Sequence, residues 1–160
     1  MPASTTKKVV LRRFEKEALA GYVNPLTFLQ LTGIELLSPE GNVSVVPYSD
    51  VKMVAFVKDF EEANEPERRV FQNRPKIEGL WLRLEYRDGE VTEGIIPNNL
   101  LQIEKHGFTV VPPDPNGNTQ RVLIPRTALR SVQVLGVVGS PLKRLKRKTV
   151  PKEQIGLFED

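Results

Sequence analysis

The sequence predicts an all-β protein: two tandem, small, five-stranded β-barrels that arose by internal duplication, followed by a flexible C-terminal tail. Short apolar stretches broken by Gly, Pro, Asn and Asp dominate the chain, and this pattern is typical of strands joined by turns. A series of landmark residues also occurs twice in the same order, which indicates a repeat. The strand pattern stops after residue 139.

The first matching segments are two strands that each lead into a turn. Residues 10–14 correspond to residues 82–86, and each segment is followed by a strand that contains a glycine. The second copy has Asp88-Gly89 at the turn, which is a strong hairpin signal. The first copy has residues 15–18 there, without glycine, so we expect a turn of another type.

The rest of each copy repeats as well. Residues 33–39 correspond to residues 107–113, and residues 45–54 correspond to residues 123–132. The last pair shares a skeleton of two apolar residues, Pro, three residues, an apolar residue, two residues and Val. Proline ends a strand because it has no N–H for the ladder, so the next three residues are expected to form a single 3₁₀ turn before a last strand.

Period-two alternation on bent strands predicts which side chains are buried. In the first barrel these are Val10, Phe14, Ile34, Leu36, Val45, Val51 and Val54. In the second barrel these are Leu82, Leu84, Tyr86, Phe108, Val110, Leu123, Leu129 and Val132. Residues 114–120 are rich in turn formers and are expected to form an exposed hairpin loop.

The predicted organisation has five parts. They are a disordered N-terminus (1–7), a first barrel (8–60), a linker (61–78), a second barrel (79–139) and a basic flexible tail (140–160). In the linker, Pro66 is suited to open a short helix and Pro75 to stop it. Val70 and Phe71 would then anchor this helix to a barrel.

Composition excludes several classes of site. The 160-residue chain has no cysteine, which excludes disulfides, thiolate zinc sites and cysteine nucleophiles. No apolar run approaches the roughly 20 residues needed to span a bilayer. The N-terminus has no apolar signal core, so we expect a soluble cytoplasmic protein that does not associate with a membrane.

The net positive charge of the chain comes from the tail. The net charge is +3, from 23 Lys and Arg against 20 Asp and Glu. Because the tail from Lys143 onward holds six basic and three acidic residues, residues 1–142 hold 17 of each sign. Composition therefore indicates no basic face on the barrels, although folding could gather five arginines: Arg12, Arg13, Arg121, Arg126 and Arg130.

No residue pattern indicates catalysis, a metal or a cofactor. The single histidine, His106, lies in an expected loop, where a histidine is usually solvated. Asp59, Glu61 and Glu62 cluster at the end of the first barrel without calcium-loop spacing. Residues 114–118 offer oxygen atoms that turn chemistry already explains. We therefore expect no catalytic residues, no metal ligands and no cofactor.

The chain resembles an uncharacterised bacterial family of tandem Sm-like or SH3-like small β-barrels. The resemblance covers residues 8–140 and is carried by residues 54–60, 87–90 and 107–115. It implies the tandem-barrel fold but brings no known activity with it. The Asp88-Gly89 turn followed by Gly94 is similar to the first Sm motif, and residues 122–134 are similar to the second.

Sm-like proteins suggest nucleic-acid binding by analogy alone. Bases would stack on aromatic side chains in loops. The matching loops are residues 47–50 and residues 125–128, of which only the first has an aromatic residue, and an acid lies nearby. Arg126 and Arg130 fit half of the PilZ signature for cyclic dinucleotides, but the partner motif is missing.

The tail looks like a peptide ligand. Its terminal QIGLF segment resembles the bacterial sliding-clamp-binding pentapeptide and departs from it at Ile155; the candidate docking residues are Gln154, Ile155, Leu157 and Phe158. The alternative is that these apolar side chains fold back on the barrels. The preceding cations are candidate phosphate contacts: Lys143, Arg144, Lys146, Arg147 and Lys148.

Three functions follow as hypotheses. The first is a non-catalytic adaptor whose tail docks a partner protein, with the sliding clamp as the sharpest candidate. The second is an Sm-like module that binds RNA or DNA. The third is a regulatory interaction domain that oligomerises through barrel edges, because small barrels leave strand edges that pair readily.

Overall fold

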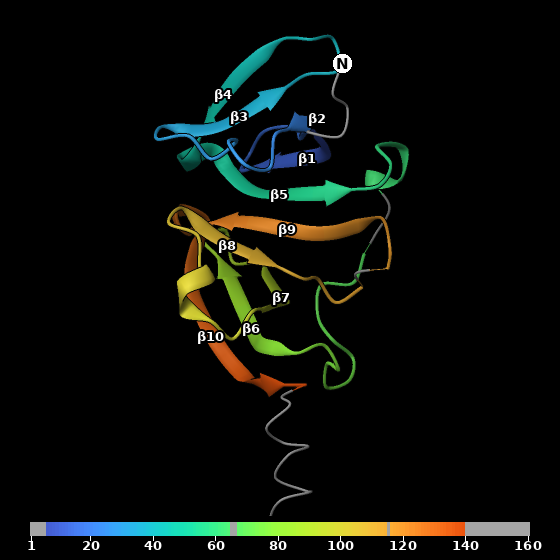
Figure 1. The fold of residues 1–160 in the computed structure, drawn as a ribbon, viewed down its shortest axis with the longest axis vertical. Helices are drawn as coiled ribbons and strands as arrows, with labels where there is room; N and C mark the ends of the chain where they lie inside the picture. Colours follow the sequence, from blue (N-terminus) through green and yellow to red (C-terminus); the bar gives the residue numbers. More distant parts are fainter. Residues whose placement is uncertain (1–5, 65–66, 115, 140–160) are drawn as a thin grey trace, which may run out of the picture.

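The computed structural model describes residues 6–64, 67–114 and 116–139. The described residues form an all-β fold of ten strands and four short 3₁₀ turns, as the sequence predicts. Figure 1 shows two units stacked along the long axis of the molecule. The N-terminal unit comprises residues 6–60, and the C-terminal unit comprises residues 79–139.

Each unit contributes five strands in the same order. The N-terminal unit contains β1 (Lys7–Arg13), β2 (Leu19–Val23), β3 (Gly33–Leu37), β4 (Val43–Pro47), η2 (Tyr48–Asp50) and β5 (Val51–Val57), followed by η3 (Glu61–Asn64). The C-terminal unit contains β6 (Gly79–Tyr86), β7 (Val91–Ile96), η4 (Leu100–Gln102), β8 (Gly107–Val110), β9 (Thr119–Pro125), η5 (Arg126–Ala128) and β10 (Leu129–Val138). Both units place a 3₁₀ turn between their fourth and fifth strands.

Matching strand registers support the duplication. In the β3–β4 pair Gly33 lies opposite Pro47, and in the β8–β9 pair Gly107 lies opposite Pro125. Both glycines are required by a close backbone approach. A Cβ on Gly33 would lie 2.2 Å from a carbonyl oxygen of the facing strand, and a Cβ on Gly107 would lie 2.3 Å from the corresponding oxygen.

A single sheet crosses from one unit to the other. β5 pairs antiparallel with β9, so seven strands form one sheet in the order β4-β3-β2-β1-β5-β9-β8. The remaining strands form a sheet in the order β10-β6-β7. Figure 1 shows β5 and β9 side by side at the middle of the molecule. The junction between the units is therefore a strand pair.

The two cores exchange side chains across this junction. Leu123, from β9, is 1% exposed and belongs to the core of the N-terminal unit. In the opposite direction, Phe14 and Met53 of the N-terminal unit pack against the core of the C-terminal unit. Arg87 donates hydrogen bonds to the carbonyl oxygens of Ser49 and Thr127, which ties the units together at one end of the sheet.

The expected core register in β1 is wrong by one residue. Val9 and Leu11 fill the core of the N-terminal unit. Val10 is buried but points to the other face, where it packs with Ala55 and Val57. Phe14 is only half-buried. Period two still holds, but the segment Val9-Val10-Leu11 is apolar throughout and does not show which face is the core.

The expected burial of Val10 is confirmed, but two other expectations of burial are wrong for a different reason. Val45 in β4 is 47% exposed, and Val132 in β10 is 39% exposed. Both strands lie at an end of their sheet, so no neighbouring strand covers these side chains. Phe108 and Leu129 are half-buried. The other predicted core residues are buried: Ile34, Leu36, Val51, Val54, Leu82, Leu84, Tyr86, Val110 and Leu123.

Two loop expectations also differ from the structure. Asn118 and Thr119 are buried rather than exposed, and Thr119 already belongs to β9. The helix expected between Pro66 and Pro75 does not form over residues 67–75. This segment is irregular with bends, and Phe71 packs edge-on against Trp81, with ring centroids 6.1 Å apart.

Candidate functional site

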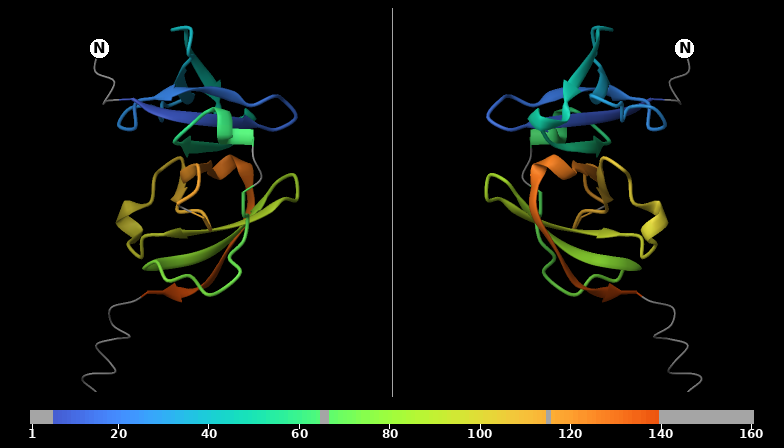
Figure 2. Two further views of the ribbon diagram at one scale, coloured as in Figure 1. Left: turned by 90° about the vertical axis from the view of Figure 1, so that its right-hand side faces the viewer. Right: turned by 90° about the vertical axis from the view of Figure 1, so that its left-hand side faces the viewer.

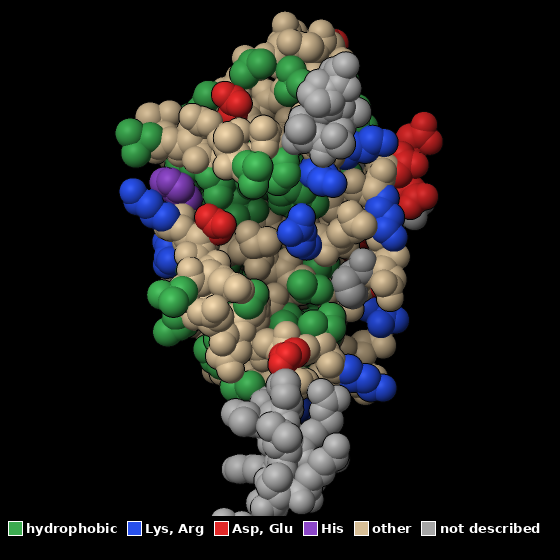
Figure 3. Space-filling model, viewed as in Figure 1, with side chains coloured by type: hydrophobic (Ala, Val, Ile, Leu, Met, Phe, Trp, Pro, Cys, Tyr) green, Lys and Arg blue, Asp and Glu red, His purple; other side chains and the backbone are tan. Residues whose placement is uncertain are grey.

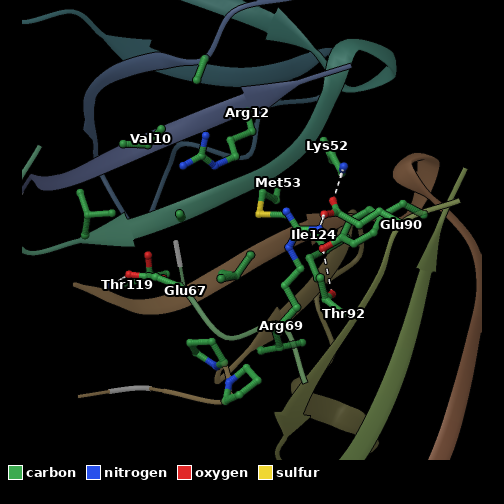
Figure 4. A pocket seen from close by; sticks show the side chains of 18 of the residues that line it. Val10, Arg12, Lys52, Met53, Glu67, Arg69, Glu90, Thr92, Thr119 and Ile124 are labelled. Atoms are coloured by element: carbon green, nitrogen blue, oxygen red, sulfur yellow. Dashed lines mark hydrogen bonds and ion pairs between the residues drawn. The ribbon is translucent and has the colours of Figure 1, made fainter. Parts of the chain in front are cut away.

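A groove of about 780 Å³ opens where the two units meet (Figure 4). Its floor is formed by apolar side chains of the central strands, and we call it the junction groove. The floor residues come from both units: Val10, Met53, Ala55, Val122 and Ile124. The one-residue shift in β1 therefore has a consequence, because it turns Val10 away from the core and toward this groove.

The rim of the junction groove is rich in cations. Six basic residues line it: Arg12, Arg13, Lys16, Lys52, Arg68 and Arg69. Three carboxylates lie among them: Glu67, Glu90 and Glu93. Residues 1–142 are balanced in charge overall, so folding concentrates positive charge at this groove. In Figure 4, Arg12 extends from the N-terminal unit and Arg69 from the opposite side.

Lys52 is the centre of an ion-pair network at one end of the groove. Its Nζ lies 2.8 Å from Oδ2 of Asp88 and also pairs with Glu90, which in turn pairs with Arg69. Partial burial alone would lower the pKa of Lys52, but the bonds to Asp88 and Glu90 outweigh this and raise it above its ordinary value. The bond from Lys52 lowers the pKa of Asp88.

Tyr86 forms part of the wall beneath this network. Its side chain is fully buried, and burial raises the pKa of its phenol to about 12. The Thr92 hydroxyl donates to the Tyr86 oxygen at 3.2 Å, and Nζ of Lys52 lies 5.1 Å from the ring centroid. Tyr86 therefore remains a neutral phenol at physiological pH and supports the position of Lys52.

The other carboxylates hold the linker against the groove. Glu93 accepts hydrogen bonds at 3.0 Å from the Trp81 indole N–H and at 3.0 Å from the Phe71 backbone N–H. Glu67 accepts from the Thr119 backbone N–H at 3.1 Å. The acids are thus engaged in structure, whereas Arg68 is exposed and forms no ion pair with a described residue.

Comparison with known proteins gives a family but no function. Residues 5–136 match the model of a family of unknown function (DUF6982). The chain belongs to this family. No curated protein and no solved structure matches the chain.

The DUF6982 chain gathers only some of the arginines that the sequence singles out. Arg12 and Arg13 line the junction groove. The other three lie elsewhere: Arg121 over the Phe56 ring, Arg126 over the Phe108 ring, and Arg130 paired with Glu85. Sequence reasoning missed Lys52, Arg68 and Arg69, because only the folded linker brings the last two residues to the central sheet.

The remaining sequence candidates have structural roles in the described part of the DUF6982 chain. His106 stacks on Tyr48, with ring centroids 4.8 Å apart and planes 12° apart. This histidine, purple in Figure 3, lies at the surface at the level where the units meet. Asp59 accepts a hydrogen bond from the Glu61 backbone N–H. The described residues contain no group of three or more potential metal ligands.

Hydrogen bonds also hold the two loops, residues 47–50 and residues 125–128, that are expected to correspond to base-contacting loops of Sm-like proteins. The Tyr48 hydroxyl donates to the carbonyl of Gln30 at 2.5 Å, and Thr127 donates to the carbonyl of Tyr48 at 3.1 Å. Burial raises the pKa of the Tyr48 phenol. The loop residues therefore connect the two units to each other, and Tyr48 already has its ring against His106.

The tail candidates lie outside the described residues. They are the docking residues Gln154, Ile155, Leu157 and Phe158 and the cations Lys143, Arg144, Lys146, Arg147 and Lys148. No helix formed by the described residues is long and apolar enough to cross a membrane.

Proposed function

We propose that the protein is a non-catalytic adaptor of the cytoplasm, built on two Sm-like or SH3-like units, which binds a segment of a partner protein in the junction groove. The observation that carries this proposal is the apolar floor beneath a cationic rim. An apolar floor suits aliphatic or aromatic side chains of a bound segment. The rim cations suit acidic side chains beside them.

The composition of the walls favours a peptide over a polyphosphate. Glu67, Glu90 and Glu93 are interspersed with the cations of the same groove, so its positive charge is divided into small patches that suit single carboxylates better than a run of phosphate groups. The aromatic residue in the lining, Tyr86, is buried and offers no free face for a base. A peptide that alternates apolar and acidic side chains complements both the floor and the excess of cations.

Selection from a display library of short random peptides tests this proposal on the full chain. We expect enrichment of peptides that combine apolar and acidic residues. The double variant Arg13→Glu, Arg68→Glu should weaken their binding at least tenfold. Lys105→Glu is the control, because Lys105 is exposed and lies outside the groove. Failure to enrich any peptide, or equal binding to the double variant, would disprove groove binding.

The tail is a second docking element in this proposal. The motif formed by Gln154, Ile155, Leu157 and Phe158 resembles a sliding-clamp ligand, so the proposed partner is the bacterial clamp. A tail peptide should bind a bacterial clamp, and the Leu157→Ala, Phe158→Ala peptide should not, because these apolar side chains fill the pocket. Equal and negligible binding of both peptides would remove the clamp from the proposal.

Nucleic-acid binding is the second candidate, and the cationic rim is the observation that favours it. Fluorescence polarisation with single-stranded and duplex probes tests it at low and at physiological salt. Phosphate contacts would make the affinity fall steeply with salt. Binding that disappears when residues 142–160 are deleted would assign it to the tail, and binding that disappears in the Arg13→Glu, Arg68→Glu variant would assign it to the groove.

A further inference from the structure

Two strand edges of the described fold have no neighbour. The seven-stranded sheet ends at β4 and β8, and the three-stranded sheet ends at β10 and β7. The ends at β7 and β8 meet, because Ile95 and Val111 exchange backbone hydrogen bonds of 3.0 and 2.8 Å. β4 and β10 are left open. They lie toward opposite ends of the long axis in Figure 1, and Figure 2 shows β10 along the side of the C-terminal unit.

Both open edges carry exposed aliphatic side chains. Val43 and Val45 in β4 are 64% and 47% exposed, and Val132 and Val134 in β10 are 39% and 57% exposed. Natural edge strands are usually protected by charged residues, Pro or bulges. Residues 43–46 and residues 131–138 contain no charged residue, Pro47 lies only at the end of β4, and the register shifts of β10 leave residues 131–134 regularly paired. Edges of this kind are suited to pair with another strand.

The duplication shows which strand fits each edge. At the junction, the fifth strand of the first unit pairs with the fourth strand of the second unit, with Val54 opposite Leu123. Both of these residues are buried, at 0% and 1% exposure. The repeat equates Val54 with Val132 and Leu123 with Val45. The same two positions are thus buried at the junction and exposed at the open edges.

We propose that a second copy of this chain covers these edges, with β10 of one copy pairing antiparallel with β4 of the next. The register is that of the β5–β9 pair. It places Val132 opposite Val45, as in the buried pair Val54 and Leu123, and Val134 opposite Val43, so four exposed aliphatic side chains come into contact. The interface repeats a contact that the chain already makes within itself.

The arrangement is head-to-tail, since each copy offers a different surface to each of its neighbours. Such an interface is heterologous and generates either a closed ring or an open filament. Every copy inside the assembly then has both edges paired. The junction groove lies between the two units of each copy, so self-assembly leaves it separate from the new contact, and the two proposals can fail independently.

The first test is the mass of the full chain in solution. Light scattering after gel filtration, from about 1 µM to about 1 mM, covers the range of weak to moderate dissociation constants. We expect the mass to rise with concentration beyond that of a single chain. Val45→Lys or Val134→Lys should abolish the rise, and circular dichroism should show an unchanged fold because both side chains are exposed. A single chain at every concentration would overturn the proposal.

Mixing the two variants tests the head-to-tail geometry. Val45→Lys blocks only the β4 edge, and Val134→Lys blocks only the β10 edge. Each variant alone should therefore remain a single chain, while the mixture should form a dimer that cannot extend further. A dimer of either variant alone would contradict the proposal, because it would require a symmetric edge contact.

Crosslinking tests the register. The natural chain has no cysteine, so introduced thiols report a single contact. A mixture of Val45→Cys and Val132→Cys chains should form a disulfide-linked dimer, because directly opposed Cβ atoms are about 4.5–5.5 Å apart. Ser44→Cys is the matched control, since its side chain points to the other face and should link to Val132→Cys at least tenfold more slowly. Equal rates would overturn the register.

Discussion

Asn118 shows how a single side chain can fasten two units together. Its Oδ1 accepts hydrogen bonds from the backbone N–H groups of Lys58 and Asp59, at 3.1 and 2.8 Å. Its Nδ2 donates to the Asp59 carbonyl at 2.9 Å. The side chain therefore joins the start of β9 to the end of β5. The sequence predicts an exposed loop here because it is rich in turn-forming residues. It does not distinguish an Asn that forms a turn from one whose side chain binds a distant backbone segment.

We expect Asn118→Ala to destabilise the fold by about 2 kcal/mol, because the Asp59 N–H is left without its partner in a partly buried site. Urea denaturation followed by circular dichroism measures the change. Asn116→Ala is the control, since Asn116 is exposed and contributes only its backbone carbonyl to Lys58. Equal losses in the two variants would show that the side-chain bonds of Asn118 contribute little.

The phenol of Tyr86 predicts an alkaline loss of stability. The unfolded chain releases this proton near pH 10, whereas burial holds the pKa of Tyr86 at about 12 in the folded state. Between these values the folded state binds the extra proton, so the free energy of unfolding falls as pH rises, by about 3 kcal/mol in total. Below pH 10 both states are protonated and the effect is absent.

Tyr86→Phe isolates this effect. The variant should be slightly less stable at pH 7, because it loses the hydrogen bond from Thr92. Its stability should fall less steeply than that of the natural chain between pH 10 and 12. Lys52 also loses stabilisation as the pH rises through its raised pKa, but it does so in both proteins. Parallel pH profiles of unfolding free energy would contradict the assignment.

At the scale of the elements, the fourth-strand hairpins depend on glycine. A Cβ on Gly107 would lie 2.3 Å from the Ile124 carbonyl oxygen and 2.9 Å from the Cα of Pro125, both of which are backbone atoms. Gly107→Ala should therefore cost about 2–3 kcal/mol through strain in the β8–β9 pair. Gly136→Ala is the control, because its nearest atom is 3.7 Å away at the end of Arg74. Thermal unfolding distinguishes the two variants.

A feature of a strand could be predicted from the sequence where neighbouring residues in the chain determine it. The proline that ends β4 and β9 and the 3₁₀ turn after it follow from backbone chemistry, and they are correctly predicted. The face of β1 is not, because three consecutive apolar residues fit either register. The exposure of Val45 and Val132 depends on which strand lies beside them, and this is a property of the sheet rather than of the segment.

The candidate site was predictable only in part for a similar reason. Arg12 and Arg13 lie in a recognisable strand, but Arg68 and Arg69 lie in a linker whose path the sequence does not determine. The order of charges along these segments does not indicate a groove, because the groove forms only when β5 pairs with β9. The sequence likewise predicts only that Asp88 lies in a hairpin turn. Its contact with Lys52 depends on the packing of one unit against the other.

For the whole molecule, the continuous sheet predicts cooperative unfolding. Leu123 belongs to the C-terminal unit by sequence but to the N-terminal core by packing. Leu123→Ala should therefore destabilise both units together, by about 2–5 kcal/mol, and the protein should still unfold in a single transition. Calorimetric and van't Hoff enthalpies that agree would support this expectation. Two separate transitions, with only one of them shifted, would contradict it.

The covalent connection between the units has a further consequence for how tightly each strand pair must bind. β5 and β9 belong to one chain, so their effective concentration is in the range of millimolar and the junction remains formed even if its intrinsic affinity is modest. The edges at β4 and β10 have no such tether and must supply the whole free energy of association from their own contacts. Chains that associate through these edges would therefore dissociate and reassociate while the β5–β9 pair within each chain stayed formed. The exchanging subunit of the assembly is then the pair of units, not the single unit.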